Sequence, residues 1–209
     1  LNKRILKWAV SECFVPITIG GGINSLKNIS SALRAGADKV CINSSFLESP
    51  KFIERASNKF GSQCITISID AIKFKDGYKV YDYKNNSILE ITPDELGKKA
   101  VDLGAGEILL NSVNNDGVGK GYDISLLKSL TKKIKIPVIA CGGAGKFSHM
   151  SEAINKGGCQ AIAAANIFVH SELSTIAAKA QLLRDGINIR LSSRVKYDQF
   201  EFDKFGRPY

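Results

Sequence analysis

The fold is decided by the stretch Val15-Pro16-Ile17-Thr18-Ile19-Gly20-Gly21-Gly22, which returns without a gap as Ile136-Pro137-Val138-Ile139-Ala140-Cys141-Gly142-Gly143. Each copy is a short apolar run that ends in glycine. The register holds beyond the glycines, because the apolar run 40–42 matches 161–163. Short apolar runs of this kind are typical of parallel strands, whose two faces are both covered. The sequence therefore predicts two copies of a unit made of strand, glycine turn, helix and strand.

Phosphate binding is the function that these glycine turns favour. Glycine lets backbone N–H groups approach a ligand, and the N-terminus of the following helix carries a partial positive charge. Two such turns in one chain predict a substrate with a phosphate at each end. The other interpretation is that the glycines only shape tight turns between strand and helix.

Strands and helices alternate along the chain, which predicts an α/β fold, either a βα barrel or a doubly wound sheet. Residues 73–91 interrupt this alternation. There the turn signal Asp76-Gly77 and the alternating residues after it predict a β-hairpin over the active face. Residues 192–209 predict no barrel element. We expect strands near 15–19, 38–43, 64–70, 106–111, 136–141 and 160–166, and helices near 2–12, 25–35, 50–59, 93–103, 123–132, 147–156 and 171–185.

The composition predicts one globular domain, because 209 residues with 44% hydrophobic content can bury a substantial core. The formal net charge of +9 comes from basic residues that are scattered and not interleaved with aromatic residues. This pattern argues against nucleic acid as a partner and favours anionic substrates. No apolar stretch is long enough to span a bilayer and no signal-peptide pattern is present, so we expect no membrane partner and a cytoplasmic location.

The five cysteines have no CxxC spacing and mostly lie in apolar strand patterns. We interpret them as reduced core residues, and we expect no metal site, disulfide or cofactor. Cys141 is the exception to consider, because it ends a strand beside glycines and would face a ligand there. A nucleophilic role would need a nearby histidine, and the chain has only His149 and His170.

Candidate catalytic residues stand where strands end, since the chemistry of a βα barrel lies at the carboxyl ends of its strands. Asp70 closes an apolar run and is a candidate general acid or base, or else a cap of the following turn. Ser112 and Asp116 belong to a glycine-bearing loop and are candidate substrate contacts, although Asp116 also fits a simple Asp-Gly turn. Lys39 and Glu107 stand at strand starts, where charges usually serve stability or an interface.

Six motifs together closely resemble the cyclase subunit of imidazole glycerol phosphate synthase. The resemblance covers nearly all of residues 1–191. The motifs occupy residues 16–23, 35–40, 60–63, 69–71, 104–110 and 140–145.

The resemblance implies a TIM barrel of the half-barrel-duplicated, phosphate-binding type over residues 1–191, followed by a C-terminal extension over 192–209. It implies a lyase of histidine biosynthesis that works as a heterodimer with a glutaminase subunit. That subunit supplies ammonia to convert a bisphosphorylated ribulosyl aminoimidazole-carboxamide nucleotide. The products are imidazole glycerol phosphate and aminoimidazole-carboxamide ribotide, and no cofactor is required.

The resemblance also implies roles for single residues. Asp70 matches one of the family's two catalytic aspartates, and Lys39 and Glu107 match charges at the ammonia entrance. One phosphate would be bound at Gly22, Asn43 and Ser44. The other would be bound at Gly117, Gly143, Ala164 and Ala165.

Two departures from the family pattern lead to further expectations. A typical barrel of about 250 residues would have a strand, helix and strand before Leu1, including the second catalytic aspartate. We therefore expect a partial sequence with about six of the eight βα units, whose own cyclase activity the missing aspartate would impair.

The phosphate loop carries Val118 where the family typically has Thr, and Asn114 where an acid is common. With the C-terminal extension, these residues resemble cyclase-like proteins of surface-polysaccharide clusters, which channel ammonia to a sugar amidotransferase. That function is one alternative. A non-catalytic phosphate-binding module is another.

Overall fold

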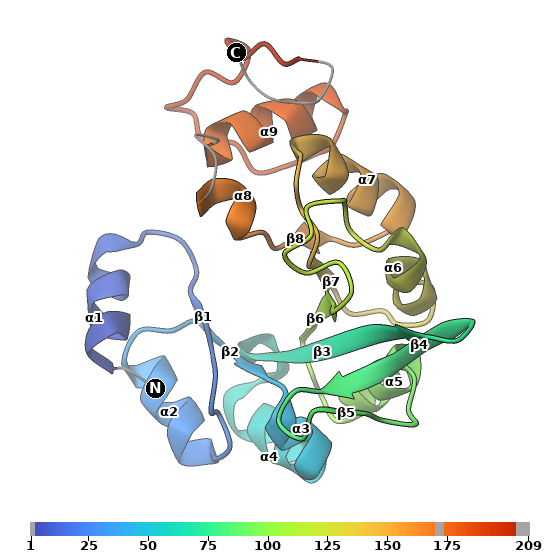
Figure 1. The fold of residues 1–209 in the computed structure, drawn as a ribbon. Helices are drawn as coiled ribbons and strands as arrows, with labels where there is room; N and C mark the ends of the chain where they lie inside the picture. Colours follow the sequence, from blue (N-terminus) through green and yellow to red (C-terminus); the bar gives the residue numbers. More distant parts are fainter. Residues whose placement is uncertain (1–2, 170–173, 204–209) are drawn as a thin grey trace.

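The computed structural model describes residues 3–169 and 174–203, and its central feature is a sheet of parallel strands. The sheet curls into an arc, as Figure 1 shows. Parallel strands curled in this way form a partial TIM barrel, and the predicted α/β fold class is confirmed. The order of the parallel strands is β1 (Thr18–Gly20), β2 (Lys39–Ile42), β3 (Ile65–Phe74), β6 (Glu107–Ser112), β7 (Val138–Cys141) and β8 (Ala161–Ile162).

The helices that connect these strands lie along the convex side of the arc (Figure 1). They are α2 (Leu26–Arg34), α4 (Lys51–Phe60), α5 (Pro93–Asp102), α6 (Ile124–Thr131) and α7 (Phe147–Gly157). Their starts follow local sequence signals, since Ser25 caps α2 and Thr92 with Glu95 forms a capping box on α5. The remaining helices are α1 (Lys3–Glu12), α3 (Ser44–Glu48), α8 (Asn166–Val169), α9 (Thr175–Arg184) and the 3₁₀ turn η1 (Ser62–Cys64).

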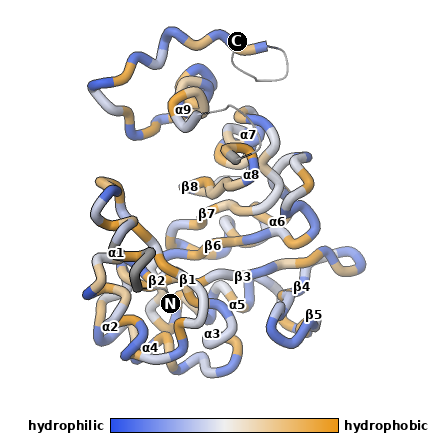
Figure 2. Tube along the Cα trace, turned by 60° about the vertical axis from the view of Figure 1, so that its left-hand side comes forward, coloured by the Kyte–Doolittle hydropathy of each residue, from blue (hydrophilic) through white to orange (hydrophobic). Residues whose placement is uncertain are grey.

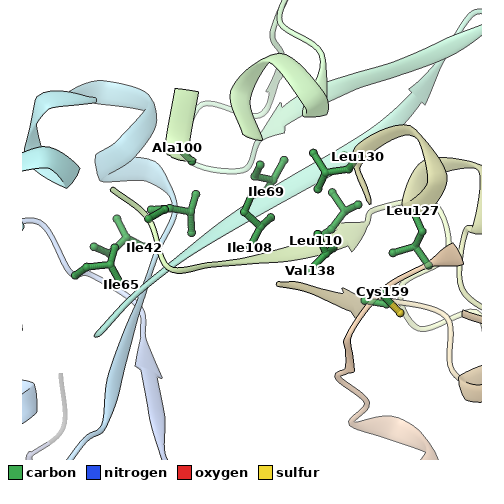
Figure 3. Close-up of a cluster of buried hydrophobic side chains, with 14 of the residues drawn as sticks. Ile42, Ile65, Ile69, Ala100, Ile108, Leu110, Leu127, Leu130, Val138 and Cys159 are labelled. Atoms are coloured by element: carbon green, nitrogen blue, oxygen red, sulfur yellow. The ribbon is translucent and has the colours of Figure 1, made fainter. Parts of the chain in front are cut away.

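The core lies between the sheet and these helices. Alternate residues of a strand point to opposite faces, so one set of side chains packs under the helices and the other faces the concave side. On β3 the helix-facing set is Ile65, Ile67 and Ile69, each at most 1% exposed. Figure 3 shows several of these side chains together with Leu127 and Leu130 of α6. On the concave side β3 presents Thr66, Ser68 and Asp70.

The predicted hairpin is present, formed by β3, β4 (Gly77–Asp82) and β5 (Ser87–Ile88) in antiparallel pairing. Its tip projects away from the sheet and is hydrophilic (Figure 2). The tip turn falls at residues 75–76, one residue before the predicted Asp76-Gly77 turn, and Lys75 takes a φ of 50°. Pairing Ala71 with Val80 keeps both side chains buried, and a shift of one residue would expose them.

Several predicted boundaries differ from the structure. The strand expected at 15–19 is β1, three residues long, because its pairing with β2 begins only after the exposed Val15 and the proline. The strand expected at 160–166 is reduced to β8, an edge strand that pairs with β7 alone among the described residues. The short helices α3 and α8 were not predicted.

The C-terminal part of the chain packs on α9. Part of the helix expected at 171–185 lies outside the described residues, and α9 begins after the capping Ser174. In the described part of the 192–209 segment, Phe202 lies under Arg184 of α9, with 5.2 Å between the guanidinium carbon and the ring centre. Among the helices in the described residues, none is long and apolar enough to cross a membrane.

Candidate active site

Asp70 lies at the carboxyl end of the parallel strands on the concave face and is only 7% exposed. Two amides from neighbouring strands hold its carboxylate. Asn111 of β6 donates through Nδ2 to Oδ1 at 3.0 Å, and Asn43, which follows β2, donates through Nδ2 to Oδ2. Asn111 is the direct register partner of Asp70, which explains why its side chain reaches the carboxylate.

Burial raises the pKa of Asp70 above its ordinary value. The hydrogen bonds from Asn111 and Asn43 act in the opposite direction, and the negative charge of Asp116 adds to the rise. A carboxyl whose pKa lies closer to neutrality exchanges protons more readily at physiological pH. The environment of Asp70 therefore suits a general acid or base.

The side-chain amide of Asn111 has an oxygen without a hydrogen-bond partner. Its Oδ1 is buried and has no hydrogen-bond partner, because its Nδ2 is committed to Asp70. A Cβ at Gly142 would lie 2.8 Å from this oxygen, so glycine is needed beside it. Buried acceptors without partners are rare and often belong to functional sites. The role of Asn111 was not predicted, although pairing the predicted third and fourth strands would have placed it opposite Asp70.

A first pocket of about 370 Å³ opens beside Asn43. It contains three residues predicted to bind one phosphate, Gly22, Asn43 and Ser44. Gly22 has a φ of 69° and open space around its Cα, so its backbone is accessible to a ligand. The lining is Gly20, Gly21, Gly22, Ile23, Asn24, Cys41, Ile42, Asn43, Ser44, Ser45, Glu48, Ser68 and Lys84.

A second pocket of about 230 Å³ lies at the ends of β7 and β8. It contains the four residues predicted to bind the other phosphate, Gly117, Gly143, Ala164 and Ala165, and also Asp116. Gly143 has a φ of 105°, and a Cβ there would lie 2.1 Å from the carbonyl oxygen of Gly121. The lining is completed by Gly119, Cys141, Gly142, Ala144, Ala163 and Asn166.

Ser112 lines neither pocket. It is buried on the helix-facing side of β6, next to Tyr122 and Leu126. Its carbonyl oxygen accepts hydrogen bonds from the N–H groups of Asn115 at 3.2 Å and Asp116 at 2.9 Å. The structure therefore places Ser112 where it shapes the loop that carries Asp116.

Lys39 and Glu107 lie at the opposite end of the same concave face. The Lys39 ammonium donates to Glu107 Oε1, and Thr66 donates to Oε2 at 3.2 Å. Thr66 precedes Asp70 by four residues on β3, which separates the two ends by about 13 Å. The strands thus have an ion pair at one end and a buried carboxylate at the other.

The cysteines are less buried than predicted. Only Cys159 is fully buried, while Cys41, Cys64 and Cys141 are half-buried and Cys13 is exposed. Four of the five lie outside the helix-facing core because they occupy concave-face or helix-end positions. Burial raises the pKa of Cys41 to about 11 and also raises that of Cys141, so both thiols are protonated at neutral pH and poor nucleophiles. No group of three or more metal-binding side chains occurs among the described residues.

Comparison with known proteins gives a consistent picture. The model of the family described as histidine biosynthesis protein matches residues 1–174. A Vibrio vulnificus protein provisionally named imidazole glycerol phosphate synthase subunit hisF2 is 52% identical over 208 residues, covering 100% of this chain and 76% of that protein. The imidazole glycerol phosphate synthase subunit HisF of Leptospira biflexa is 43% identical over 191 residues, covering 90% of this chain and 74% of its own length.

Proposed function

Because the chain belongs to the histidine biosynthesis protein family, we propose that it acts as the cyclase subunit of imidazole glycerol phosphate synthase, with Asp70 as a catalytic residue. The relatives that it resembles over most of their length carry that enzyme's name. The family's other catalytic aspartate matches no position in residues 1–209.

The observation that carries the proposal is that Asp70 is linked to both pockets. Asn43 lines the first pocket and donates to one carboxylate oxygen. Asn111 donates to the other oxygen and lies against Gly142, which lines the second pocket. A substrate with a phosphate in each pocket would therefore extend across Asp70. A bisphosphorylated ribulosyl nucleotide of the kind that the family resemblance implies has this form.

Asp70 would transfer protons during the reaction. Ammonia attacks the ribulosyl carbonyl, water leaves as the imine forms, and cleavage and ring closure follow. Each of these steps moves a proton to or from nitrogen or oxygen. A buried carboxyl with a raised pKa can take and return such protons, and the fixed amides of Asn43 and Asn111 keep its oxygens oriented.

The ammonia would come from a glutaminase subunit docked at the opposite end of the strands. Lys39, Glu107 and Thr66 form a hydrogen-bonded set there, on the same concave face as Asp70. We assign this end to the entrance for ammonia.

Replacing Asp70 tests the proposal. We expect Asp70→Asn to lower the rate of imidazole glycerol phosphate formation by roughly 100- to 10,000-fold, because the amide cannot exchange the proton. The assay uses ammonium salts as the nitrogen donor, so that no glutaminase is needed. Asp94→Asn is the matched control, since Asp94 is also a hydrogen-bonded aspartate but pairs with Lys133 on the outer helix side. Full activity of Asp70→Asn would refute the assignment.

A second candidate function is ammonia delivery to a sugar amidotransferase, and Val118 favours it. This apolar side chain is 49% exposed between two glycines that line the second pocket. It offers no hydrogen bond to a phosphate where the family typically has a hydroxyl. Failure of the complete gene to rescue a cyclase-deficient histidine auxotroph would favour this function, and rescue would exclude it.

A further inference from the structure

The turn between β4 and β5 reaches the first pocket from outside the barrel strands. The turn lies against α3, the short helix that borders this pocket, because Lys84 pairs with Glu48. Lys84 belongs to the turn and lines the pocket, and its ammonium is paired with the carboxylate of Glu48 on α3. A residue of the hairpin is therefore part of the pocket wall.

The charges in this pocket pose a problem for an anion. Among the described residues that line it, Glu48 and Lys84 are the two that carry charge. A phosphate beside an uncompensated Glu48 carboxylate would be repelled, because like charges at close range disfavour each other. The cation of Lys84 offsets the charge of Glu48 whether it lies beside the carboxylate or beside a phosphate in the same pocket, and no other described lining residue offers a cation.

Hydrogen bonds fix the backbone of the turn, whereas the side chain of Lys84 is exposed. Buried Asp82 accepts hydrogen bonds from the N–H of Lys84 at 2.9 Å and from the side-chain amide of Asn85 at 2.7 Å. The Lys84 side chain itself is 60% exposed. Its flexible four-carbon stem allows the ammonium to change partners without movement of the hairpin.

The neighbouring residue shows that the turn faces the centre of the site. The pKa of Tyr83 is raised, first by desolvation and then by the negative charges of Asp70 and Asp116. These aspartates belong to the catalytic position and to the second pocket. Since Lys84 of the same turn also lines the first pocket with Asn43 and Ser44, the turn lies at the strand ends, within reach of a bound substrate.

We propose that Lys84 is a phosphate-binding residue of the first pocket, whose ammonium leaves Glu48 and contacts the phosphate when the ligand binds. The inference rests on the proposed function, since it takes the first pocket as a phosphate site. It adds a side-chain contact to a pocket otherwise built from glycine, asparagine and serine, and it makes the hairpin a determinant of substrate affinity.

The test is a titration of 15N-labelled protein with inorganic phosphate at constant ionic strength. The amide signals of Gly21 and Gly22 report the first pocket, and those of Gly117 and Gly143 report the second. We expect Lys84→Gln to weaken binding at the first pocket by roughly fivefold and to leave the second unchanged, because an exposed charge contact in water is weak. Glu48→Gln should tighten binding at the first pocket, since it frees the lysine.

The double variant Glu48→Gln/Lys84→Gln separates direct contact from simple neutralisation. Direct contact predicts that the double variant binds more weakly than Glu48→Gln, and equal affinity of the two overturns the proposal.

Lys156→Gln is the matched control, because Lys156 is 65% exposed and also pairs with a glutamate, Glu152, at a site away from both pockets. If Lys84→Gln binds phosphate at the first pocket as tightly as the unmodified protein does, the role of Lys84 is refuted, but the assignment of the first pocket as a phosphate site is retained. If the unmodified protein shows no shifts at Gly21 and Gly22, the phosphate assignment of the first pocket fails and Lys84 with it.

Discussion

Asp70 combines deep burial with hydrogen bonds from two neutral amides. The amides favour the ionised carboxylate, but burial and the charge of Asp116 outweigh them and the pKa is raised. A cationic partner would have lowered it, as an ion pair usually does. The described groups that act on the Asp70 carboxyl are two neutral amides and another carboxylate, so the group stays suited to proton transfer and its ionisation is costly to the fold.

The stability of the protein should reflect this cost. Folding favours protonated Asp70, because its pKa is higher in the folded state than the value of about 3.9 in an unfolded chain. Its stabilising contribution is complete below about pH 3.9 and is lost as the pH rises through the folded-state pKa. We expect the free energy of unfolding of the unmodified protein, relative to Asp70→Asn, to fall over this window. Urea unfolding at intervals from pH 3.5 to 7 measures it.

Asp94 provides the opposite case in the same experiment. Burial alone would raise its pKa, but hydrogen bonds from Lys133 and Thr92 lower it. Its contribution is therefore present above the unfolded-state pKa and lost as the pH falls, so Asp94→Asn should show the reverse slope. Parallel slopes for the two variants would contradict the environment described for Asp70.

At the scale of elements, the loops after β6 and β7 meet backbone to backbone at the second pocket. The N–H of Gly121 donates to the carbonyl oxygen of Gly143 at 2.8 Å, and a Cβ on Gly143 would lie 2.1 Å from the Gly121 oxygen. In the same way, a Cβ on Gly145 would lie 1.9 Å from the carbonyl oxygen of Gly119. Side chains at these positions would separate the loops, so the pocket depends on glycine for its shape.

Gly143→Ala should therefore destabilise the protein by about 3 kcal/mol or more, because it adds a backbone clash to the strain of a positive φ. Gly186→Ala measures the cost of a positive φ without a clash, since Gly186 has a φ of 75° with nothing within 4 Å of an added Cβ. This substitution should lower the free energy of unfolding by roughly 1 kcal/mol. Urea unfolding of both variants compares the two costs. Equal losses would show that the loops separate without penalty.

The internal repeat explains which elements could be predicted. The strands followed from apolar runs, two of which end in glycine, and most helices from the stretches between them, but α3 and α8 did not, because each is too short to show a periodic pattern. Matching the two copies would have placed both at equivalent positions after the second strand of the repeat. Asp70 was predicted from its own strand, whereas Asn111 and Lys84 depend on strand register and on the path of the hairpin, which local patterns do not encode.

At the scale of the whole molecule, the concave face has two chemically different ends. The family and the barrel architecture predicted from the motifs are confirmed by the family match over residues 1–174. One end presents the Lys39–Glu107 pair, whose side chains are 29% and 22% exposed. The other end presents Asp70 between two pockets. The proposed delivery of ammonia from a partner subunit would use this separation, with ammonia entering at one end and reacting at the other.

Glu107→Gln should therefore affect the two nitrogen sources differently. With a glutaminase partner and glutamine, we expect product formation to fall by about tenfold, because the loss of one charge leaves Lys39 unpaired at the docking end. With ammonium salts the decrease should be much smaller, since Asp70 and both pockets are distant. The ratio of the two rates is the measurement. An unchanged ratio would remove the Lys39–Glu107 end from the path of ammonia.

Glycine and alanine make up most of the lining of the second pocket, and three glycines line the first, so the main chain is a large part of what these pockets offer to a ligand. Main-chain contacts survive the exchange of nearly every side chain around them. Descendants of one ancestral barrel can therefore retain the two proposed phosphate pockets while the side chains between these pockets change. In this arrangement a new substrate specificity needs only a few substitutions at strand ends and hairpins. Related barrels that share both pockets can therefore catalyse different reactions.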